Sequence, residues 1–381
     1  MRQRYSGHRK YYSPGLSDLF SPVSYGQLTG WQEDDGLPDA FAAFARLAAH
    51  ARLRSYRTGS LGVDAGAFEE AHAAARSMSP HRVTPAQARA FFEHFFLPFR
   101  VRPEAGANGF VTGYYEPEAE ASLHPTDKFC VPLYSRPDDL VAVDECNRPA
   151  NLDPYLAFAQ DAGGTLVPYY DREAIERGAL EGRGLELCWL ADRTEAFFIH
   201  VQGAARLTLP DRQHMRVTYA AKAGHRFTGI GGVLADLGEI APEEVTMQSI
   251  RAWLARNPHR QDEIFWQNRS YIFFRQTSLG DPELGPVAAA KVQLQPGRSI
   301  AVDRLLHTFG TPFFIDAPQL RLIDGGPFRR LMIAQDTGSA IIGPARADLF
   351  IGTGEKAGNV AGRVRHPADF YALLPRALVA G

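Results

Sequence analysis

Residues 330–343 read RLMIAQDTGSAIIG, and this segment decides both the fold and the candidate chemistry. The apolar run 331–334 predicts a buried strand, with Asp336 at its end and further apolar residues beyond it. Apolar surroundings disfavour the charged form of a carboxyl group, so we expect a raised pKa for Asp336, which suits an acid catalyst. Gly338 permits a tight turn or a close approach of the backbone to a ligand. From spacing alone, a structural Asp that accepts backbone hydrogen bonds at a turn is an equal alternative.

The surrounding chain has the pattern of a β-rich protein. From about residue 110 the apolar residues recur with a period of two, and Gly and Pro punctuate the runs. The predicted strands are 131–134, 197–201, 207–209, 215–219, 271–274, 299–302, 312–315, 331–334 and 349–351. Two helical stretches, near 171–182 and 243–256, interrupt them. Short strands separated by turn residues favour a closed barrel or a sandwich over βαβ units.

The first hundred residues are predicted to be helical scaffold. Phe41, Phe44, Leu47 and Ala48 recur at helical spacing, and a second stripe contains Phe91, Phe92, Phe95 and Phe96. Pro38 near the start of the first stripe, and Thr84 with Pro85 before the second, are typical of helix N-termini. Stripes of this kind are far more often core than function.

Two further acids occupy settings like that of Asp336. Asp303 ends the run SIAVD, and Asp348 opens DLFIG, so three acids at strand ends could converge at one rim of a barrel. Because Arg304 follows Asp303 and Arg346 precedes Asp348, we expect both to stay ionised and to support the site rather than donate protons. Their wide spacing matches no compact cation-binding loop, and no His pattern indicates zinc, so we expect no metal.

Composition limits the classes of function. The chain has 381 residues, enough for two domains, and its net charge of −2 provides no overall field for binding nucleic acid. No uncharged apolar run is long enough to span a membrane, and we see no signal peptide after the basic start. The three cysteines are predicted to be free, buried thiols, although Cys130 and Cys146 could pair in an exported protein.

Two motif matches indicate other functions, and both are incomplete. DTGSA resembles the aspartic protease signature, but such proteases need two Asp that share a proton, and the chain has one DTG, so two copies would have to meet at a two-fold axis. GTGEKA at 352–357 fits the loose dinucleotide fingerprint, but too little chain follows for a βαβ unit. Turn glycines explain it better.

Taken in order, seven segments resemble the membrane-bound lytic murein transglycosylase A family, whose members also have a C-terminal three-aspartate (3D) domain. The segments are GWQEDD (30–35), VTGYYEP (111–117), FIHVQG (198–203), NRSYIFF (268–274), LQPGRSIAVD (294–303), QDTGSAIIG (335–343) and ADLFIGTGEKAGNVAG (347–362). The three Asp contexts make the C-terminal set specific.

The resemblance implies a mainly β fold with peripheral helices. A double-psi β-barrel catalytic domain would contain residues 1–118 and 265–381, and an inserted β-rich domain, 119–264, would form the other wall of a glycan groove. The reaction would cleave the β-1,4 bond between N-acetylmuramic acid and N-acetylglucosamine in peptidoglycan and give a 1,6-anhydro product. The location would be periplasmic or outer-membrane-associated, although no lipobox cysteine is seen in this sequence.

The resemblance also implies roles for individual residues. Asp336 stands at the position of the catalytic acid, and Tyr114, Tyr115, Gln202 and Ser270, with Gly338, would bind the sugar, without a cofactor. Tyrosine offers sugars a flat apolar face and a hydroxyl, and glutamine offers a donor and an acceptor. For Tyr115 and Ser270 the alternative is that they are ordinary strand residues.

A single Asp suffices for such a reaction. An internal hydroxyl nucleophile has a high effective molarity, so one carboxyl group can protonate the leaving oxygen and then accept the C6 proton.

The chain departs from the family pattern at Ala204 with Ala205, at Ser339 and across residues 222–229. These departures affect how a glycan would fit more than they affect the type of reaction. The alternative hypothesis is a glycan-binding barrel without catalysis, as in expansin-like proteins. An acid with a raised pKa favours the enzyme.

Overall fold

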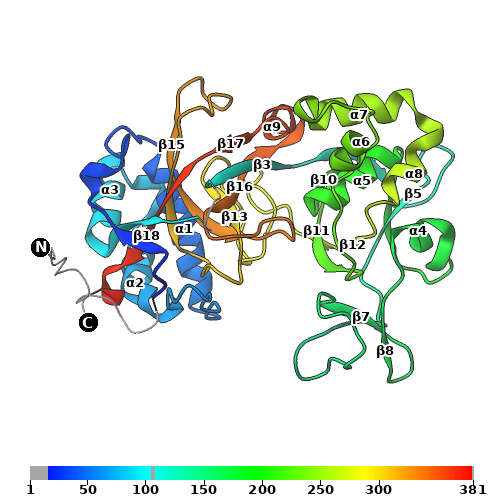
Figure 1. The fold of residues 1–381 in the computed structure, drawn as a ribbon, viewed down its shortest axis with the longest axis horizontal. Helices are drawn as coiled ribbons and strands as arrows, with labels where there is room; N and C mark the ends of the chain where they lie inside the picture. The colour runs from blue at the N-terminus through cyan, green and yellow to red at the C-terminus, as the bar shows by residue number, and fades with distance from the viewer. Residues whose placement is uncertain (1–15, 104–107, 380–381) are drawn as a thin grey trace, which may run out of the picture. The chain divides into compact units, whose positions relative to one another are not determined.

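The computed structural model describes residues 16–103 and 108–379, and the chain divides into two compact units (Figure 1). Unit 1 comprises Met1–Tyr114, Val287–Gly352 and Val364–Gly381, and unit 2 comprises Tyr115–Pro286 and Thr353–Arg363. The secondary structure is mainly β with several helices, as the sequence predicted.

Unit 1 is built on one mixed sheet of nine strands in the order β1-β2-β18-β14-β15-β13-β16-β3-β17. The strands are β1 (Phe20–Pro22), β2 (Phe96–Val101), β3 (Phe110–Glu116), β13 (Ser299–Val302), β14 (Pro312–Ala317), β15 (Phe328–Asp336), β16 (Arg346–Thr353), β17 (Arg365–Pro367) and β18 (Asp369–Pro375). Within the described residues the order begins at β1 and ends at β17, so strand pairing does not close the sheet into a barrel.

The short strand β13 lies in the middle of the half of the sheet that contains the three predicted acids. It pairs in parallel with β15 and antiparallel with β16, and all four of its residues are buried. Strands buried on both faces are expected to form continuous apolar runs, which explains why this part of the sheet was recognisable from its sequence.

Among the described residues of unit 1, the α-helices are α1 (Leu37–Ala51), α2 (Glu69–Ser77) and α3 (Pro85–Phe95). The Thr84 hydroxyl accepts a hydrogen bond from the Gln87 N–H and caps α3, as its sequence predicted. Phe41, Phe44, Leu47 and Ala48 are all buried, as expected for a core stripe. The second stripe is shorter than predicted, since α3 ends at Phe95 and Phe96 begins β2.

A buried ion pair fixes the GWQEDD segment to the sheet of unit 1. Arg298 donates from Nη2 to Asp34 Oδ1 at 2.6 Å and from Nη1 to Oδ2 at 2.8 Å, and the Leu331 N–H donates to Oδ2 at 2.9 Å. Both side chains are almost fully buried. Bidentate pairs of this kind fix geometry, so Asp34 holds the start of the apolar run that leads to Asp336.

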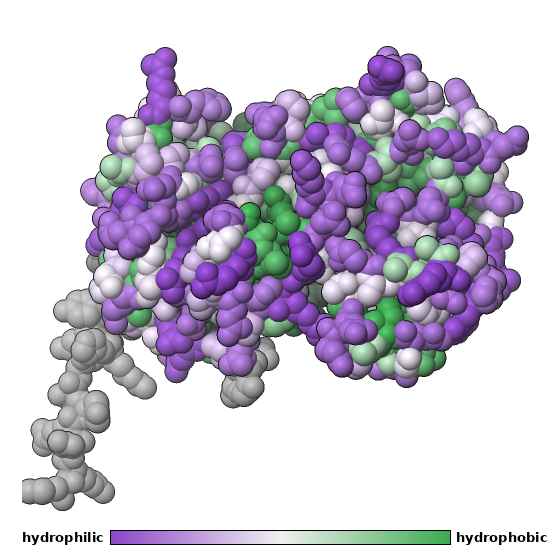
Figure 2. Space-filling model, turned by 90° about the horizontal axis from the view of Figure 1, so that it is seen from above, coloured by the Kyte–Doolittle hydropathy of each residue, from purple (hydrophilic) through white to green (hydrophobic). Residues whose placement is uncertain are grey.

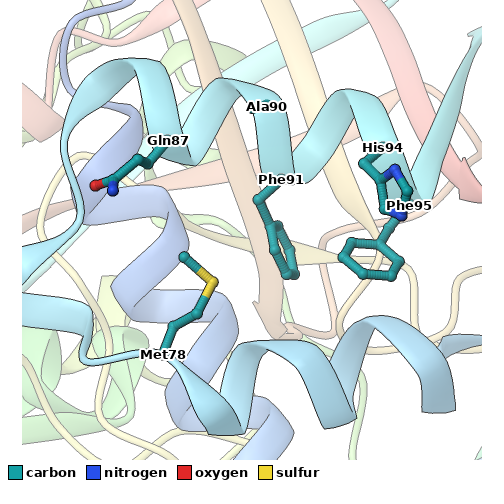
Figure 3. A pocket seen from close by; sticks show the side chains of 6 residues that line it. All are labelled: Met78, Gln87, Ala90, Phe91, His94 and Phe95. Atoms are coloured by element: carbon teal, nitrogen blue, oxygen red, sulfur yellow. The ribbon is translucent and has the colours of Figure 1, made fainter.

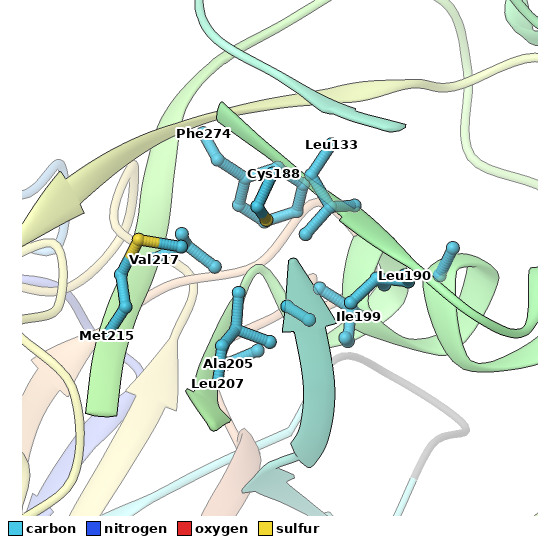
Figure 4. Close-up of a cluster of buried hydrophobic side chains, with 11 residues drawn as sticks. Leu133, Cys188, Leu190, Ile199, Ala205, Leu207, Met215, Val217 and Phe274 are labelled. Carbon is cyan, nitrogen blue, oxygen red and sulfur yellow. The ribbon is translucent and has the colours of Figure 1, made fainter. Parts of the chain in front are cut away.

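Unit 2 contains a six-stranded sheet of order β12-β11-β10-β4-β9-β5 and a three-stranded sheet of order β6-β7-β8. The strands are β4 (Glu118–Ser122), β5 (Val131–Tyr134), β6 (Leu140–Ala142), β7 (Phe158–Asp161), β8 (Leu166–Val167), β9 (Glu186–Leu190), β10 (Ala204–Thr208), β11 (His214–Lys222) and β12 (Ile272–Thr277). The helices are α4 (Arg172–Ala174), which continues into a π-turn, α5 (Arg193–Gln202), α6 (Ile230–Asp236), α7 (Met247–Arg256), α8 (Gln261–Phe265) and α9 (Gly354–Ala361). Figure 4 shows the apolar cluster that packs β9, β10 and β11 against α5.

The predicted strand 197–201 is wrong, because this run lies in helix α5. The Asp192 carboxylate caps the helix by accepting from the Glu195 N–H at 2.8 Å, and Gly203, at φ +78°, ends it. Phe197 and Phe198 pack in one buried cluster while Ile199 packs in another. A helix buried on two sides loses the one-faced apolar pattern, so its sequence resembled a strand.

The cysteines also differ from expectation. Cys188 is buried and free as predicted, whereas Cys130 and Cys146 are free but exposed. Cys130 precedes β5 and Cys146 lies in an exposed turn after β6, outside the apolar runs that form the core.

The surface of the described residues is mostly hydrophilic on the face that Figure 2 shows, with apolar side chains in separate patches. The exposed large apolar side chains are dispersed along the sequence, from Leu53 to Ile342. No helix among residues 16–103 and 108–379 is long and apolar enough to cross a membrane.

Candidate active site

Asp336 is the last residue of β15, and its carboxyl group is held by hydrogen bonds from two other segments. The Tyr114 hydroxyl donates to Oδ2 at 3.0 Å from β3, and the Ala289 N–H donates to Oδ1 at 3.2 Å. The half-buried Asp336 therefore has a fixed orientation at the end of a buried strand, which confirms where the sequence placed it.

Asp348 lies close enough to Asp336 for their charges to interact. It is half-buried within β16, and its Oδ1 accepts a hydrogen bond from the Thr112 hydroxyl at 2.7 Å. Arg346 Nη2 donates to the same hydroxyl oxygen at 2.7 Å. Because Thr112 and Tyr114 are two residues apart on β3, they point to the same face and contact one acid each.

Burial decides the ionisation of both acids. It raises the pKa of Asp336, against the opposing effects of the Thr337 and Ala289 N–H groups, the Tyr114 hydroxyl and the Lys291 charge. It also raises the pKa of Asp348 to about 6, and the neighbouring charge of Asp336 adds to this rise. The raised pKa that the sequence predicted for Asp336 is found, and its role as the catalytic acid stays a prediction.

Two expectations about Asp348 are wrong. It is the third residue of β16 and not a strand-end residue, and its pKa is raised although Arg346 was expected to hold it down. Arg346 does favour the ionised form, but its guanidinium bonds to Thr112 and to the Ala347 carbonyl, and burial has the larger effect.

Asp303 follows β13 and stabilises the loop beyond Asp336. Its Oδ2 accepts from the Gly343 N–H at 3.0 Å and its Oδ1 accepts from the Leu305 N–H at 3.0 Å. In the same loop the Ile341 N–H donates to the Gly338 carbonyl at 3.0 Å, so Gly338 begins a tight turn. Asp303 is thus tied to the loop by backbone hydrogen bonds.

The arrangement suits proton transfer. Because the pKa of the Asp336 carboxyl group is raised, its protonated form persists to a higher pH than in an ordinary aspartate, and the partners from β3 and residue 289 fix its orientation. Within residues 16–103 and 108–379, no group of three or more His, Cys, Asp or Glu side chains is placed to hold a metal ion.

Comparison with solved structures identifies the family. A membrane-bound lytic murein transglycosylase from Agrobacterium tumefaciens shares 50% sequence identity and a TM-score of 0.87, over 94% of this chain and 98% of that one. The chain belongs to the membrane-bound lytic murein transglycosylase A (MltA) family. MltA from Neisseria gonorrhoeae is also similar, with 30% identity and a TM-score of 0.76 over 96% of each chain.

Sequence comparisons agree with this MltA assignment. Residues 110–275 match the MltA specific insert domain, and residues 298–374 match the 3D domain, which contains all three predicted acids. The membrane-bound lytic murein transglycosylase A of Vibrio cholerae is 29% identical over 264 residues, which are 68% of this chain. The match spans 63% of the length of that relative.

Two predicted sugar-binding residues of this MltA chain contact each other in unit 2. The Tyr115 N–H donates to Gln202 Oε1 at 3.2 Å, and Gln202 is the last residue of α5. The Tyr115 side chain is buried, bonds to Arg251 and packs against Gly358 of α9. The buried Tyr115 side chain therefore has protein contacts already, whereas Tyr114 presents its hydroxyl to Asp336.

Ser270 has a different environment in unit 2. Its side chain is buried, and its carbonyl accepts a hydrogen bond from Arg172 Nη2 at 2.8 Å. The Arg172 guanidinium, itself buried, also packs over the rings of Phe197 and Tyr271. The sugar-binding roles of Tyr114, Tyr115, Gln202, Ser270 and Gly338 stay predictions.

Sequence reasoning missed Thr112 and Ala289 at this MltA site. Ala289 contributes a backbone N–H, for which the sequence provides no signal. Thr112 lies in VTGYYEP, and its position two residues before Tyr114 was the available signal for a shared strand face.

An apolar pocket in unit 1 lies on a different element. Figure 3 shows it along α3, where its lining residues are Met78, Gln87, Ala90, Phe91, His94 and Phe95. None of these six residues is a carboxylic acid, and neither Tyr114 nor Ala289, which hold the Asp336 carboxyl group, is among them.

Proposed function

We propose that this chain is a lytic transglycosylase that cleaves the β-1,4 bond between N-acetylmuramic acid and N-acetylglucosamine in peptidoglycan. The observation that supports it is the Asp336 carboxyl group, which has a raised pKa and hydrogen bonds from Tyr114 and Ala289. The names of the similar proteins from Agrobacterium and Vibrio agree with this activity.

In the proposed reaction Asp336 acts twice. The protonated carboxyl group first donates its proton to the glycosidic oxygen as the bond from C1 to that oxygen breaks. The C6 hydroxyl of the same muramic acid residue then attacks C1, and its proton passes to the Asp336 carboxylate. The product carries a 1,6-anhydro bond, no water is consumed, and the acid returns to its starting state.

Asp348 raises the question of a second acid. Most glycosidases use a pair of carboxyl groups, of which one attacks the sugar or activates water. The Asp348 carboxyl accepts the Thr112 hydroxyl hydrogen bond on Oδ1, and we assign it an electrostatic role: its charge favours the protonated form of Asp336 and stabilises the positive transition state.

Mass spectrometry of digested peptidoglycan tests the proposal. Sacculi incubated with the purified chain should release muropeptides that end in 1,6-anhydro-muramic acid, and the Asp336→Asn variant serves as the control. Products heavier by one water as the main species would identify a hydrolase and contradict the mechanism. Binding to sacculi without any release would favour the glycan-binding alternative.

The remaining predictions about fold and location form part of this proposal. They are a double-psi β-barrel domain of residues 1–118 and 265–381, an inserted domain of residues 119–264, and a glycan groove. They rest on the family resemblance alone, because strand pairing in the described residues leaves the sheet of unit 1 open, and residues 265–286 and 353–363 cluster with unit 2. We also propose a periplasmic or outer-membrane-associated location, in agreement with the words "membrane-bound" in the names of the relatives.

A further inference from the structure

A tight hairpin at residues 287–293 supplies the backbone donor to Asp336. Val287 and Gln293 form an antiparallel bridge, and the Ala288 N–H donates to the Val292 carbonyl at 3.0 Å. The Lys291 N–H donates to the Ala288 carbonyl at 2.9 Å, and Lys291 itself has φ +63°. A residue other than glycine is uncommon in this left-handed region, so contacts around the hairpin must maintain its shape.

Those contacts converge on one residue, Ala290. Its N–H donates to the Gln335 carbonyl at 3.0 Å, and its carbonyl accepts from the Tyr56 hydroxyl at 2.7 Å. Ala290 is fully buried and packs with Leu47 and Val292. The peptide groups on both sides of Ala290 are therefore fixed, and the first of them lies directly after Ala289, the donor to Asp336.

Tyr56 is suited to hold this position. Its ring packs edge-on against Phe309, with centroids 6.1 Å apart. Burial raises the pKa of Tyr56, so the hydroxyl keeps its proton and donates at every working pH. Tyr56 follows α1 in the chain. The same helix also holds Gln335, whose Nε2 donates to the carbonyl of Ala43 in α1 at 2.9 Å.

We propose that Tyr56 is a positioning residue for Asp336, which acts through Ala290 to keep the Ala289 N–H on the catalytic carboxyl group. Its kinetic consequence rests on the transglycosylase function proposed above. Without the Tyr56 hydroxyl, the Ala290 carbonyl loses this hydrogen bond. The peptide group that follows Ala290 in the hairpin is then no longer fixed by Tyr56.

The charged and titratable groups that face Asp336 come from three segments. Tyr114 lies on β3, Asp348 on β16 and Lys291 on the hairpin. Removal of the Tyr56 hydroxyl changes none of these groups directly. A shift in the titration of Asp336 would therefore report on the hairpin and its Ala289 N–H.

The first experiment compares Tyr56→Phe with Tyr25→Phe in activity against pH. Tyr25 is a matched control in unit 1, because its hydroxyl also donates to backbone carbonyls, those of Phe92 at 3.0 Å and Phe96 at 3.2 Å. For Tyr56→Phe we expect kcat to fall by about 3- to 10-fold and KM to change by less than about twofold, because the acid is misplaced while glycan contacts persist. The Ala289 N–H favours ionised Asp336, so its loss should move the high-pH limb of the profile up by about half a unit.

The second experiment does not depend on activity. In protein labelled with ¹⁵N-alanine, the Ala289 amide is the resonance whose pH titration disappears in Asp336→Asn. Tyr56→Phe should reduce that titration shift by at least about half, as expected for a weakened hydrogen bond, while Tyr25→Phe should leave it unchanged. An unchanged Ala289 titration in Tyr56→Phe would overturn the proposal, as would the absence of any alanine amide that titrates with Asp336. If no variant or wild-type protein cleaves peptidoglycan, the function fails but this measurement still decides the role of Tyr56.

Discussion

Asp336 on β15 and Asp348 on β16 both pair with Ala301, which lies on β13, the strand between them. Residues in register on neighbouring strands direct their side chains to the same face. Tyr114 bonds to the first acid and Thr112 to the second. The charge of Asp336 adds to the rise that burial causes in the pKa of Asp348.

Asp336→Asn should abolish turnover and leave binding to sacculi nearly unchanged. The amide has the shape of the carboxyl group but cannot donate and recover a proton. Loss of a positioned acid lowers rates by about 10² to 10⁴. Because Asp336 is proposed to serve both steps, its loss should lower the rate by an amount at the upper end of this range. Product release by chromatography and cosedimentation with sacculi measure the two effects. More than about a tenth of wild-type activity would mean that another residue is the acid.

Asp348→Asn should change how stability depends on pH. The folded protein raises the pKa of Asp348 from 3.8 to about 6, so the native state binds more protons than the unfolded state between these values. Unfolding free energy should then fall as pH rises through this window, and the loss should be complete above pH 6. Asn cannot ionise, so between pH 4 and 7 the variant should gain about 1 to 2 kcal/mol relative to wild type, after a discount for partial solvent screening.

Urea unfolding of both proteins at several pH values checks this prediction. If the difference in unfolding free energy between Asp348→Asn and wild type stays constant from pH 4 to 7, the pKa of Asp348 is not raised. In the activity assay the same variant should lose less than Asp336→Asn, because the role proposed for Asp348 is electrostatic.

Asp303→Asn should mainly lower thermal stability. Each Asp303 oxygen accepts one backbone N–H, from Leu305 and from Gly343, and an amide keeps only one acceptor oxygen. Loss of a hydrogen bond to a charged group costs about 1.5 to 3 kcal/mol, so the melting temperature should fall. Activity should fall less than in Asp336→Asn. A loss that equals that of Asp336→Asn, with an unchanged melting temperature, would require a pair of catalytic carboxylates.

The features of the site that could be predicted from sequence are those with a local signal. The strand before Asp336 is an unbroken apolar run, and such runs predict buried strands. The cap at Thr84 and the buried stripe of α1 followed from short-range spacing in the same way. The environment of Asp348 could not be derived, because its pKa depends on Thr112, Asp336 and the depth of burial, which only the folded sheet brings together.

Other errors arose where tertiary packing overrides local pattern. Helix α5 has apolar residues in succession because it is buried on two sides, and this pattern is shared by strands. The Ala289 N–H contacts a residue 47 positions away in the chain, and the Tyr56 hydroxyl contacts one 234 positions away. No single-sequence pattern encodes such pairs.

Gly358→Ala should destabilise unit 2, because this glycine lies against a buried tyrosine ring. A Cβ at Gly358 would lie 2.7 Å from Tyr115 Cε2, and the Tyr115 ring is buried, so it has little freedom to move. Overpacking of this kind costs about 1 to 3 kcal/mol.

Gly232→Ala is the matched control. Gly232 is also a helical glycine of unit 2, but no atom lies within 4 Å of a Cβ added there. Unfolding monitored by circular dichroism should show a loss in Gly358→Ala, and little change or a gain in Gly232→Ala, because alanine is the better helix former by about 1 kcal/mol. Equal stability of the two variants would show that the Tyr115 ring can shift, and its proposed contact with the sugar would then gain support.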